Sequence, residues 1–267
     1  MQKVISKDGT AIAYDQSGQG PAVILVGGAF SYRLYPDSVK LAELLSKHFT
    51  VINYDRRGRG DSSDNAPYAV EREIEDLEAL INAAGGSTYL WGLSSGAVLA
   101  LKAAQHGLNI KKLVIYDPPF MVDNSGTLPP ADFISHLQKL AAADRRADAI
   151  RYFMTKGMGA PGFVVTMMRF MPGVWHRLKA VANTLPYDAA ILKGYAEGKP
   201  LVAGEWAAVT TPTLVLAGAK STLMLRNAAK AIVDVLPNAR HREVEGLSHT
   251  SIVMTVLAPI MVEFFNS

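Results

Sequence analysis

Short apolar runs recur along the chain, and segments with helical periodicity lie between them. Ala22–Val26 is apolar at every position, as expected of a strand that is buried on both faces. Glu71–Ala84 instead carries Ile74, Leu77 and Ile81 at the spacing of one helix face. This alternation of strand and helix predicts a mostly parallel sheet that is covered by helices on both sides.

The remaining elements follow the same alternation in two blocks of sequence. The first block predicts further strands at Thr10–Tyr14, Phe49–Tyr54, Thr88–Leu93 and Leu113–Tyr116, and helices at Val39–Leu45 and Ala97–Gln105. The second block predicts strands at Thr213–Ala217 and His241–Val244, and helices at Leu223–Leu236 and Ile252–Phe265.

A helix-like segment separates the two blocks. Residues 121–206 contain no convincing strand and are rich in Met, Phe, Tyr and Trp. The simplest account is an α/β core built from residues 1–120 and 207–267, with residues 121–206 as a helical insertion. The insertion would leave the carboxyl end of a strand, which is the edge where open α/β sheets bind ligands.

Composition excludes several classes of function. The chain has no cysteine, so disulfides, thiolate catalysis and cysteine-ligated metals are ruled out. Its formal net charge of +3 comes without a dense basic run, which argues against nucleic-acid binding. Met1–Gly9 lacks an apolar signal core, and no stretch reaches the roughly 18 apolar residues of a membrane span. We therefore expect a soluble, cytoplasmic protein with no membrane partner.

The strongest local motif is Gly92-Leu93-Ser94-Ser95-Gly96, which matches G-x-S-x-G. An apolar strand precedes it and a helix rich in small residues follows it, which is the context that a nucleophile elbow requires. Such a turn would push the Ser94 hydroxyl out above the sheet, next to the free N–H groups of the helix start. The alternative is a chance match in a loop that contains Gly and Ser, and the context favours a nucleophilic Ser94.

An oxyanion hole needs a second backbone donor from another loop. Val26-Gly27-Gly28-Ala29-Phe30 follows an early buried strand and is the natural candidate. The Ala29 N–H would then act together with the Ser95 N–H. The alternative is a Gly-Gly turn with no ligand.

A nucleophilic serine also needs a base, and the chain has six histidines. His249 follows the last predicted strand, and the expected chain order places the catalytic His last. We take the other five as ordinary polar residues: His48, His106, His136, His176 and His241.

Together these residues resemble the α/β-hydrolase superfamily, in particular its small bacterial members with a helical cap. The resemblance covers essentially the whole chain and includes Tyr54–Ser62, which looks like the family's structural D-x-R-G-x-G-x-S turn. It implies a mostly parallel eight-stranded sheet flanked by helices, with a helical cap inserted after the sixth strand. Gly27-Gly28 replaces the usual His-Gly of the oxyanion loop, a change that backbone donors should tolerate.

The triad acid departs from the family pattern. The usual acid follows the strand before the last one, but Leu216–Thr222 contains no carboxylate. Asp117 ends the strand after the nucleophile strand, so a parallel sheet would bring it to the same edge as Ser94. We predict that Asp117 orients His249. A His249 supported only by hydroxyls such as that of Ser221, by carbonyls or by water remains the alternative.

The insertion's Met and aromatic side chains suggest an apolar substrate site. Most should form the cap's own core, and we expect Phe30, Met154, Met167 and Phe170 to contact substrate. The leading function is hydrolysis of an uncharged, largely apolar ester, thioester or lactone through an acyl-Ser94 intermediate, without metal or cofactor. Carbon–carbon bond hydrolysis, cofactor-free oxygenation and a ligand-binding protein with weak activity are the alternatives. Whether the chain forms a homodimer stays open.

Overall fold

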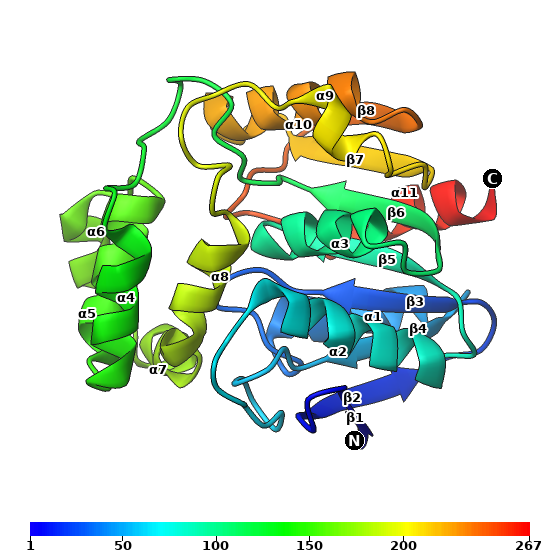
Figure 1. Ribbon diagram of the computed structural model, residues 1–267, viewed down its shortest axis with the longest axis horizontal. Helices are drawn as coiled ribbons and strands as arrows, with labels where there is room; N and C mark the ends of the chain where they lie inside the picture. The colour runs from blue at the N-terminus through cyan, green and yellow to red at the C-terminus, as the bar shows by residue number, and fades with distance from the viewer.

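A computed structural model describes all residues, 1–267, and its centre is one eight-stranded sheet (Figure 1). The strand order is β1-β2-β4-β3-β5-β6-β7-β8; the pairs β1–β2 and β2–β4 are antiparallel, and all the other pairs are parallel. The strands are β1 (Gln2–Ile5), β2 (Ala11–Ser17), β3 (Ala22–Val26), β4 (Thr50–Tyr54), β5 (Thr88–Leu93), β6 (Ile110–Tyr116), β7 (Thr213–Gly218) and β8 (Ala239–Val244). The predicted fold class is confirmed.

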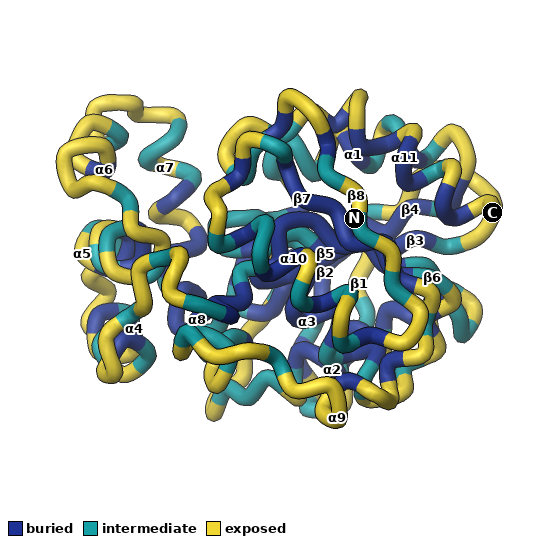
Figure 2. Tube along the Cα trace, turned by 90° about the horizontal axis from the view of Figure 1, so that it is seen from above, coloured by how far each residue is buried: buried dark blue, intermediate teal, exposed yellow.

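Helices cover both faces of the sheet, as Figures 1 and 2 show. One face packs against α1 (Pro36–Leu45) and α11 (Met254–Asn266). The other packs against α2 (Val70–Ala83), α3 (Ser95–Gln105) and α10 (Leu223–Val235). The central strands are buried between these layers, which explains why β3 is apolar throughout and β5 is polar only at Thr88. None of the helices has both the length and the hydropathy to cross a membrane.

β1 is the strand that periodicity did not reveal. Three of its four residues are exposed, and it lies at the edge of the sheet. An edge strand of this kind needs no apolar run, because pairing with β2 along Gln2–Ile5 holds it in place.

Between β6 and β7 the chain contains only helices and turns (Figure 1). These helices are α4 (Phe133–Ala142), α5 (Arg146–Tyr152), a π-helical turn (Phe153–Gly157), α6 (Gly162–Met168), α7 (Pro172–Ala180), a 3₁₀ turn (Ala182–Thr184), α8 (Leu185–Ile191) and α9 (Ala203–Trp206). Helices α4 to α7 lie beyond the carboxyl ends of the parallel strands, and α8 lies between them and the sheet. We call α4 to α8 the cap. Its own apolar core includes Phe133, Leu137, Ile150 and Leu178.

Candidate active site

Ser94 sits at the sharp turn between β5 and α3. Its φ of 55° and ψ of −126° place a non-glycine residue in strained backbone geometry. The flanking glycines make the turn feasible: a Cβ on Gly96 would lie 2.3 Å from the Val26 carbonyl oxygen, and one on Gly92 would lie 2.6 Å from the Ala97 Cα. The motif therefore forms the elbow that its sequence predicted.

Two backbone donors with no partner in the chain flank this turn. The Ala29 N–H makes no hydrogen bond within the chain. Ser95 is the first residue of α3, where an N–H has no intrahelical acceptor. Ala29 and Ser95 line the same cavity as Ser94, so their N–H groups are available to an oxyanion there.

His249 and Asp117 meet at the carboxyl edge of the sheet. Asp117 Oδ2 lies 3.3 Å from His249 Nδ1, and the Asp117 side chain is fully buried. The same carboxylate accepts hydrogen bonds from the Ser221 hydroxyl at 2.6 Å and the Gly218 N–H at 3.1 Å. Ser221, the alternative partner of the imidazole, thus holds the carboxylate and not the ring.

Ser94 and His249 both line the cavity, and neither Ser94 Oγ nor His249 Nε2 makes a hydrogen bond within the chain. A nucleophile and its base are often too far apart for a hydrogen bond until substrate binds. The arrangement can support acyl transfer once the two groups approach each other.

The cavity has a volume of about 680 Å³ and a mostly apolar wall. Phe30 from the oxyanion loop meets the cap residue Phe153 edge to face, with ring centroids 5.7 Å apart. No group of three or more His, Asp or Glu side chains in the chain could hold a metal ion. The apolar part of the wall includes Leu25, Leu41, Trp91, Met121, Phe133, Ile134, Phe153, Met154, Met168, Val174, Leu178, Leu225 and Met254.

The family model of the α/β hydrolases matches residues 22–257. The chain belongs to the α/β hydrolase family. Among solved structures it is similar to an α/β hydrolase from Sphaerobacter thermophilus DSM 20745, with 47% identity, a TM-score of 0.91, and 99% and 100% of the two chains covered. A hydrolase from Pseudomonas aeruginosa PA01 shares the fold at 22% identity and a TM-score of 0.72, with 100% and 98% covered.

A further relative is the uncharacterized hydrolase YraK of Bacillus subtilis (strain 168). It is 30% identical to this α/β hydrolase over 117 residues. That stretch is 41% of this chain and 42% of YraK, so the match spans less than half of either protein.

The charged residues on the cavity wall of this hydrolase are few. They are Asp37, Arg56, Lys193 and Glu197. Lys193 and Glu197 are exposed, Asp37 is half-buried, and Arg56 is neutralised by Glu73 and Asp188. A charged group of a substrate would therefore meet no buried, unpaired charge of opposite sign on the cavity wall.

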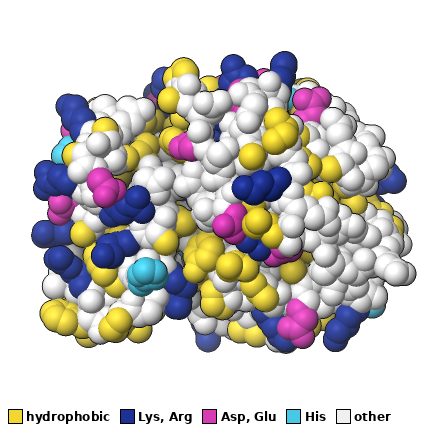
Figure 3. Space-filling view, turned by 90° about the horizontal axis from the view of Figure 1, so that it is seen from below, with side chains coloured by type: hydrophobic (Ala, Val, Ile, Leu, Met, Phe, Trp, Pro, Cys, Tyr) yellow, Lys and Arg dark blue, Asp and Glu magenta, His cyan; other side chains and the backbone are white.

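Two of the four residues that the sequence predicts to contact substrate lie on the cavity wall. Phe30 and Met154 line the cavity. Met167 and Phe170 do not: their exposed fractions are 64% and 82%, and they lie on the outer face of the cap. The physical reason is helix phase, because the neighbouring Met168 reaches the cavity instead. Figure 3 shows many Lys and Arg side chains on the cap side of the molecule.

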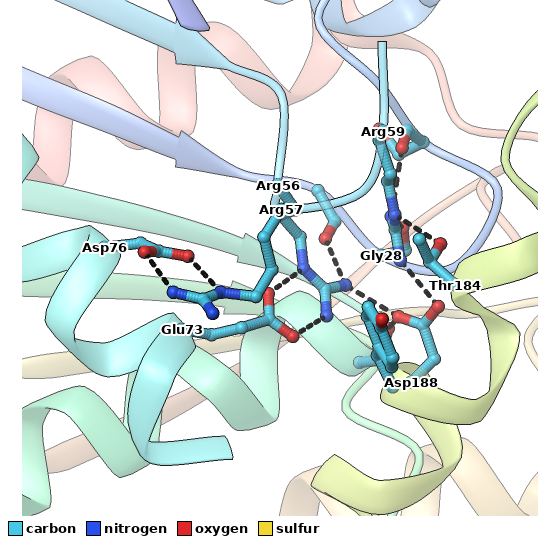
Figure 4. Close-up of polar contacts among 12 residues, drawn as sticks. Gly28, Arg56, Arg57, Arg59, Glu73, Asp76, Thr184 and Asp188 are labelled. Carbon is cyan, nitrogen blue, oxygen red and sulfur yellow. Dashed lines mark hydrogen bonds and ion pairs between the residues drawn. The ribbon is translucent and has the colours of Figure 1, made fainter. Parts of the chain in front are cut away.

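A buried cluster of four charged residues links this hydrolase's cap to its core, and sequence analysis missed its cap member, Asp188 (Figure 4). Arg56 pairs with both oxygens of Glu73 at 2.6 and 2.7 Å, and with Asp188 Oδ1 at 2.6 Å. Arg59 pairs with Asp188 Oδ2 at 2.6 Å. All four side chains are at most 3% exposed.

Asp188 stays ionised in this environment. Burial raises the pKa of Asp188, but the positive charges of Arg59 and Arg56 outweigh burial and hold it below its ordinary value. A signal for this residue existed in the sequence: Asp188 is the only carboxylate between Asp148 and Glu197, while the turn after β4 carries three arginines.

Proposed function

We propose that this α/β hydrolase cleaves uncharged, largely apolar esters, thioesters or lactones through an acyl-Ser94 intermediate. The observation that carries the proposal is the buried Asp117 carboxylate 3.3 Å from His249 Nδ1, at the edge of a cavity that Ser94 also lines. A carboxylate in this position fixes the tautomer in which Nε2 can accept a proton.

The proposed reaction follows from the placement of these groups. Ser94 Oγ attacks the substrate carbonyl carbon while His249 Nε2 takes the hydroxyl proton. The carbonyl oxygen becomes an oxyanion that accepts hydrogen bonds from the Ala29 and Ser95 N–H groups. When the bond to the leaving oxygen or sulfur breaks, the imidazolium returns the proton to it. Water then repeats the sequence on the acyl ester and releases the acid.

The cavity supports an uncharged substrate. A carboxylate placed against its apolar wall would lose hydration without gaining a partner, because Arg56 is already saturated. Burying neutral acyl chains against Phe153, Met154 and Met168 is favourable by about 25 cal/mol per Å² of apolar surface removed from water.

The alternatives keep the same scaffold. Carbon–carbon bond hydrolysis and cofactor-free oxygenation would use the same His249, and a binding protein would need no base. The Asp117–His249 pair favours an active enzyme over a binding protein, since a buried carboxylate that orients an imidazole serves chemistry and not ligand affinity.

The test combines labelling with turnover. The wild type is expected to react with a fluorophosphonate at Ser94, located by mass spectrometry, and to show a burst with chromogenic acyl esters. Ser94→Ala should lose both while keeping its melting temperature. Retained turnover in Ser94→Ala would overturn the proposal. Oxygen uptake without a cofactor, or cleavage of vinylogous diketones but not esters, would replace it with one of the alternatives.

A further inference from the structure

The Gly28 carbonyl and the Ala29 N–H belong to one peptide unit. That peptide is trans, since the chain's cis peptide is Ala66–Pro67. In a trans peptide the C=O and the N–H share a rigid plane and point in opposite directions. Whatever holds the Gly28 oxygen therefore sets the direction of the Ala29 N–H, one of the two donors proposed for the oxyanion.

Two donors hold that oxygen: the Ser31 N–H at 3.2 Å and, at shorter range, the charged guanidinium of Arg59. Its Nη1 donates to the Gly28 oxygen at 2.7 Å and to the Ser31 oxygen at 3.0 Å. Its Nε donates to Thr184 Oγ1 at 2.9 Å and its Nη2 to Asp188 Oδ2 at 2.6 Å, so every guanidinium nitrogen is engaged (Figure 4). A charged donor on a carbonyl also polarises the peptide, which makes the opposite N–H a stronger donor.

Asp188 connects this arrangement to the second donor. Its Oδ1 accepts a hydrogen bond from the Ser95 hydroxyl at 2.7 Å, and Ser95 is the residue whose N–H completes the pair. Arg56, on the same oxygen, also reaches the Gly27 carbonyl at 3.3 Å. One carboxylate from cap helix α8 thus contacts Ser95 directly and the Gly28–Ala29 peptide through Arg59.

We propose that Arg59 is a positioning residue for the oxyanion hole, acting through the Gly28–Ala29 peptide, and that Asp188 holds it in register from the cap. This rests on the proposed function. It assigns the turn after β4 a role in transition-state stabilisation, beyond the structural role that its sequence suggested.

Arg57, close to Arg59 in the same turn, provides a matched control. Arg57 is fully buried like Arg59 and has an equally complete set of partners. It pairs with both oxygens of Asp76, with Asp8 and with the Arg72 carbonyl, and it makes no hydrogen bond to the oxyanion loop or to the cap. Arg59→Lys and Arg57→Lys should therefore destabilise the fold alike while differing in catalysis.

The experiment compares these two variants with the wild type. The readouts are melting temperature, kcat and KM on a chromogenic acyl ester, and the infrared stretch of a slowly deacylating, ¹³C-carbonyl-labelled acyl group on Ser94. In Arg59→Lys we expect kcat to fall about 10²-fold with KM nearly unchanged. A misdirected N–H donor weakens the stabilisation of the transition state but not the binding of the substrate. The acyl carbonyl stretch should move to higher frequency as its hydrogen bonds weaken. Arg57→Lys should keep both kcat and the frequency.

A milder variant guards against misfolding. Thr184→Val preserves all four charges and removes one acceptor of the Arg59 guanidinium, so it should shift the same readouts by a smaller amount. An unchanged kcat and carbonyl frequency in whichever of these variants folds, or an equal loss in Arg57→Lys, would overturn the role of Arg59. Absence of any acyl-enzyme in the wild type would overturn the proposed function itself.

Discussion

His249 Nδ1 lies 3.3 Å from Asp117 Oδ2, although 132 residues separate the two in the chain. Asp117 follows β6, and His249 follows β8 across the intervening strand β7. The segment after β7 contributes no carboxylate. It supplies instead the Gly218 N–H and the Ser221 hydroxyl that hold Asp117 in place. In the proposed mechanism the acid therefore follows β6, whereas the family resemblance implied an acid after β7.

The first prediction concerns this pair. Asp117→Asn should keep the fold but allow the wrong imidazole tautomer, a change that lowers turnover by about 10⁴-fold in a serine protease. The measurement is kcat over a pH series on an acyl ester that the wild type hydrolyses. A loss of less than about tenfold would remove Asp117 from the catalytic group.

Ser221→Ala is the companion variant. Because the Ser221 hydroxyl touches the carboxylate and not the ring, its removal should cost much less turnover than Asp117→Asn. A larger loss for Ser221→Ala would transfer the orienting role to the segment after β7.

The second prediction separates the two faces of α6. Met168 lines the cavity, whereas its neighbour Met167 is 64% exposed on the outer face. Met168→Lys should change which acyl chain lengths are accepted, because a charge would face the apolar wall. Met167→Lys should leave the profile as it is. The check is kcat/KM across a series of acyl esters, and equal effects from both variants would contradict the placement of α6.

The third prediction concerns Gly28. A Cβ added there would lie 2.7 Å from the Leu93 carbonyl oxygen and 2.9 Å from the Ser94 Cβ. Gly28→Ala must therefore push the oxyanion loop away from the elbow, and a displacement approaching 1 Å can cost about 10²-fold in turnover. Gly162→Ala, where an added Cβ meets nothing within 4 Å, is the control and should keep full kcat. Normal kcat in a folded Gly28→Ala would show that this loop does not contact the reacting carbonyl.

The fourth prediction concerns stability and pH. Burial raises the pKa of Asp188, and Arg59 with Arg56 outweighs burial, so this pKa is lower in the folded protein than in the unfolded chain. Its stabilising contribution is then fully present above the ordinary aspartate pKa of about 4 and declines as the pH falls through the lower, folded value. Asp188→Asn should cost about 3–5 kcal/mol of unfolding free energy at pH 7, since it leaves buried guanidinium charge unpaired.

Urea denaturation between pH 7 and pH 3 provides the measurement. The difference between the wild type and Asp188→Asn should shrink in acid, and a difference that grows as the pH falls would contradict the assigned charge state. Asp148→Asn, which breaks a half-exposed ion pair with Arg145 on the same cap, should change stability little at any pH.

Buried parallel strands were the most predictable part of the fold. Ala22–Val26 and Thr88–Leu93 have the same bounds in the sequence prediction and in the structure, because a strand buried on both faces is predominantly apolar. The position of Asp117 at the same sheet edge as Ser94 was predictable for a related reason, since neighbouring parallel strands end at one edge. β1 was not predicted, because an exposed edge strand has no run of apolar residues.

The cap was less predictable for two physical reasons. In a helix as short as α6, composition does not reveal which of two adjacent methionines faces inward, so the sequence predicts Met167 although Met168 lines the cavity. The role of Asp188 was not predicted, because its partners Arg56 and Arg59 lie about half the chain away in sequence. A single aspartate in a helix gives no indication of which residues it will pair with.

The anchoring of α8 sets limits on recombining this protein with its relatives. A cap exchanged as one block at residues 121 and 206 would remove Thr184 and Asp188 and leave Arg56 and Arg59 buried against foreign side chains. A chimera whose crossover instead follows α7 keeps those acceptors with the parent sheet and can still import a new α4–α7 wall. The crossover for such a graft therefore belongs within the cap, between α7 and α8, and not at the two ends of the insertion.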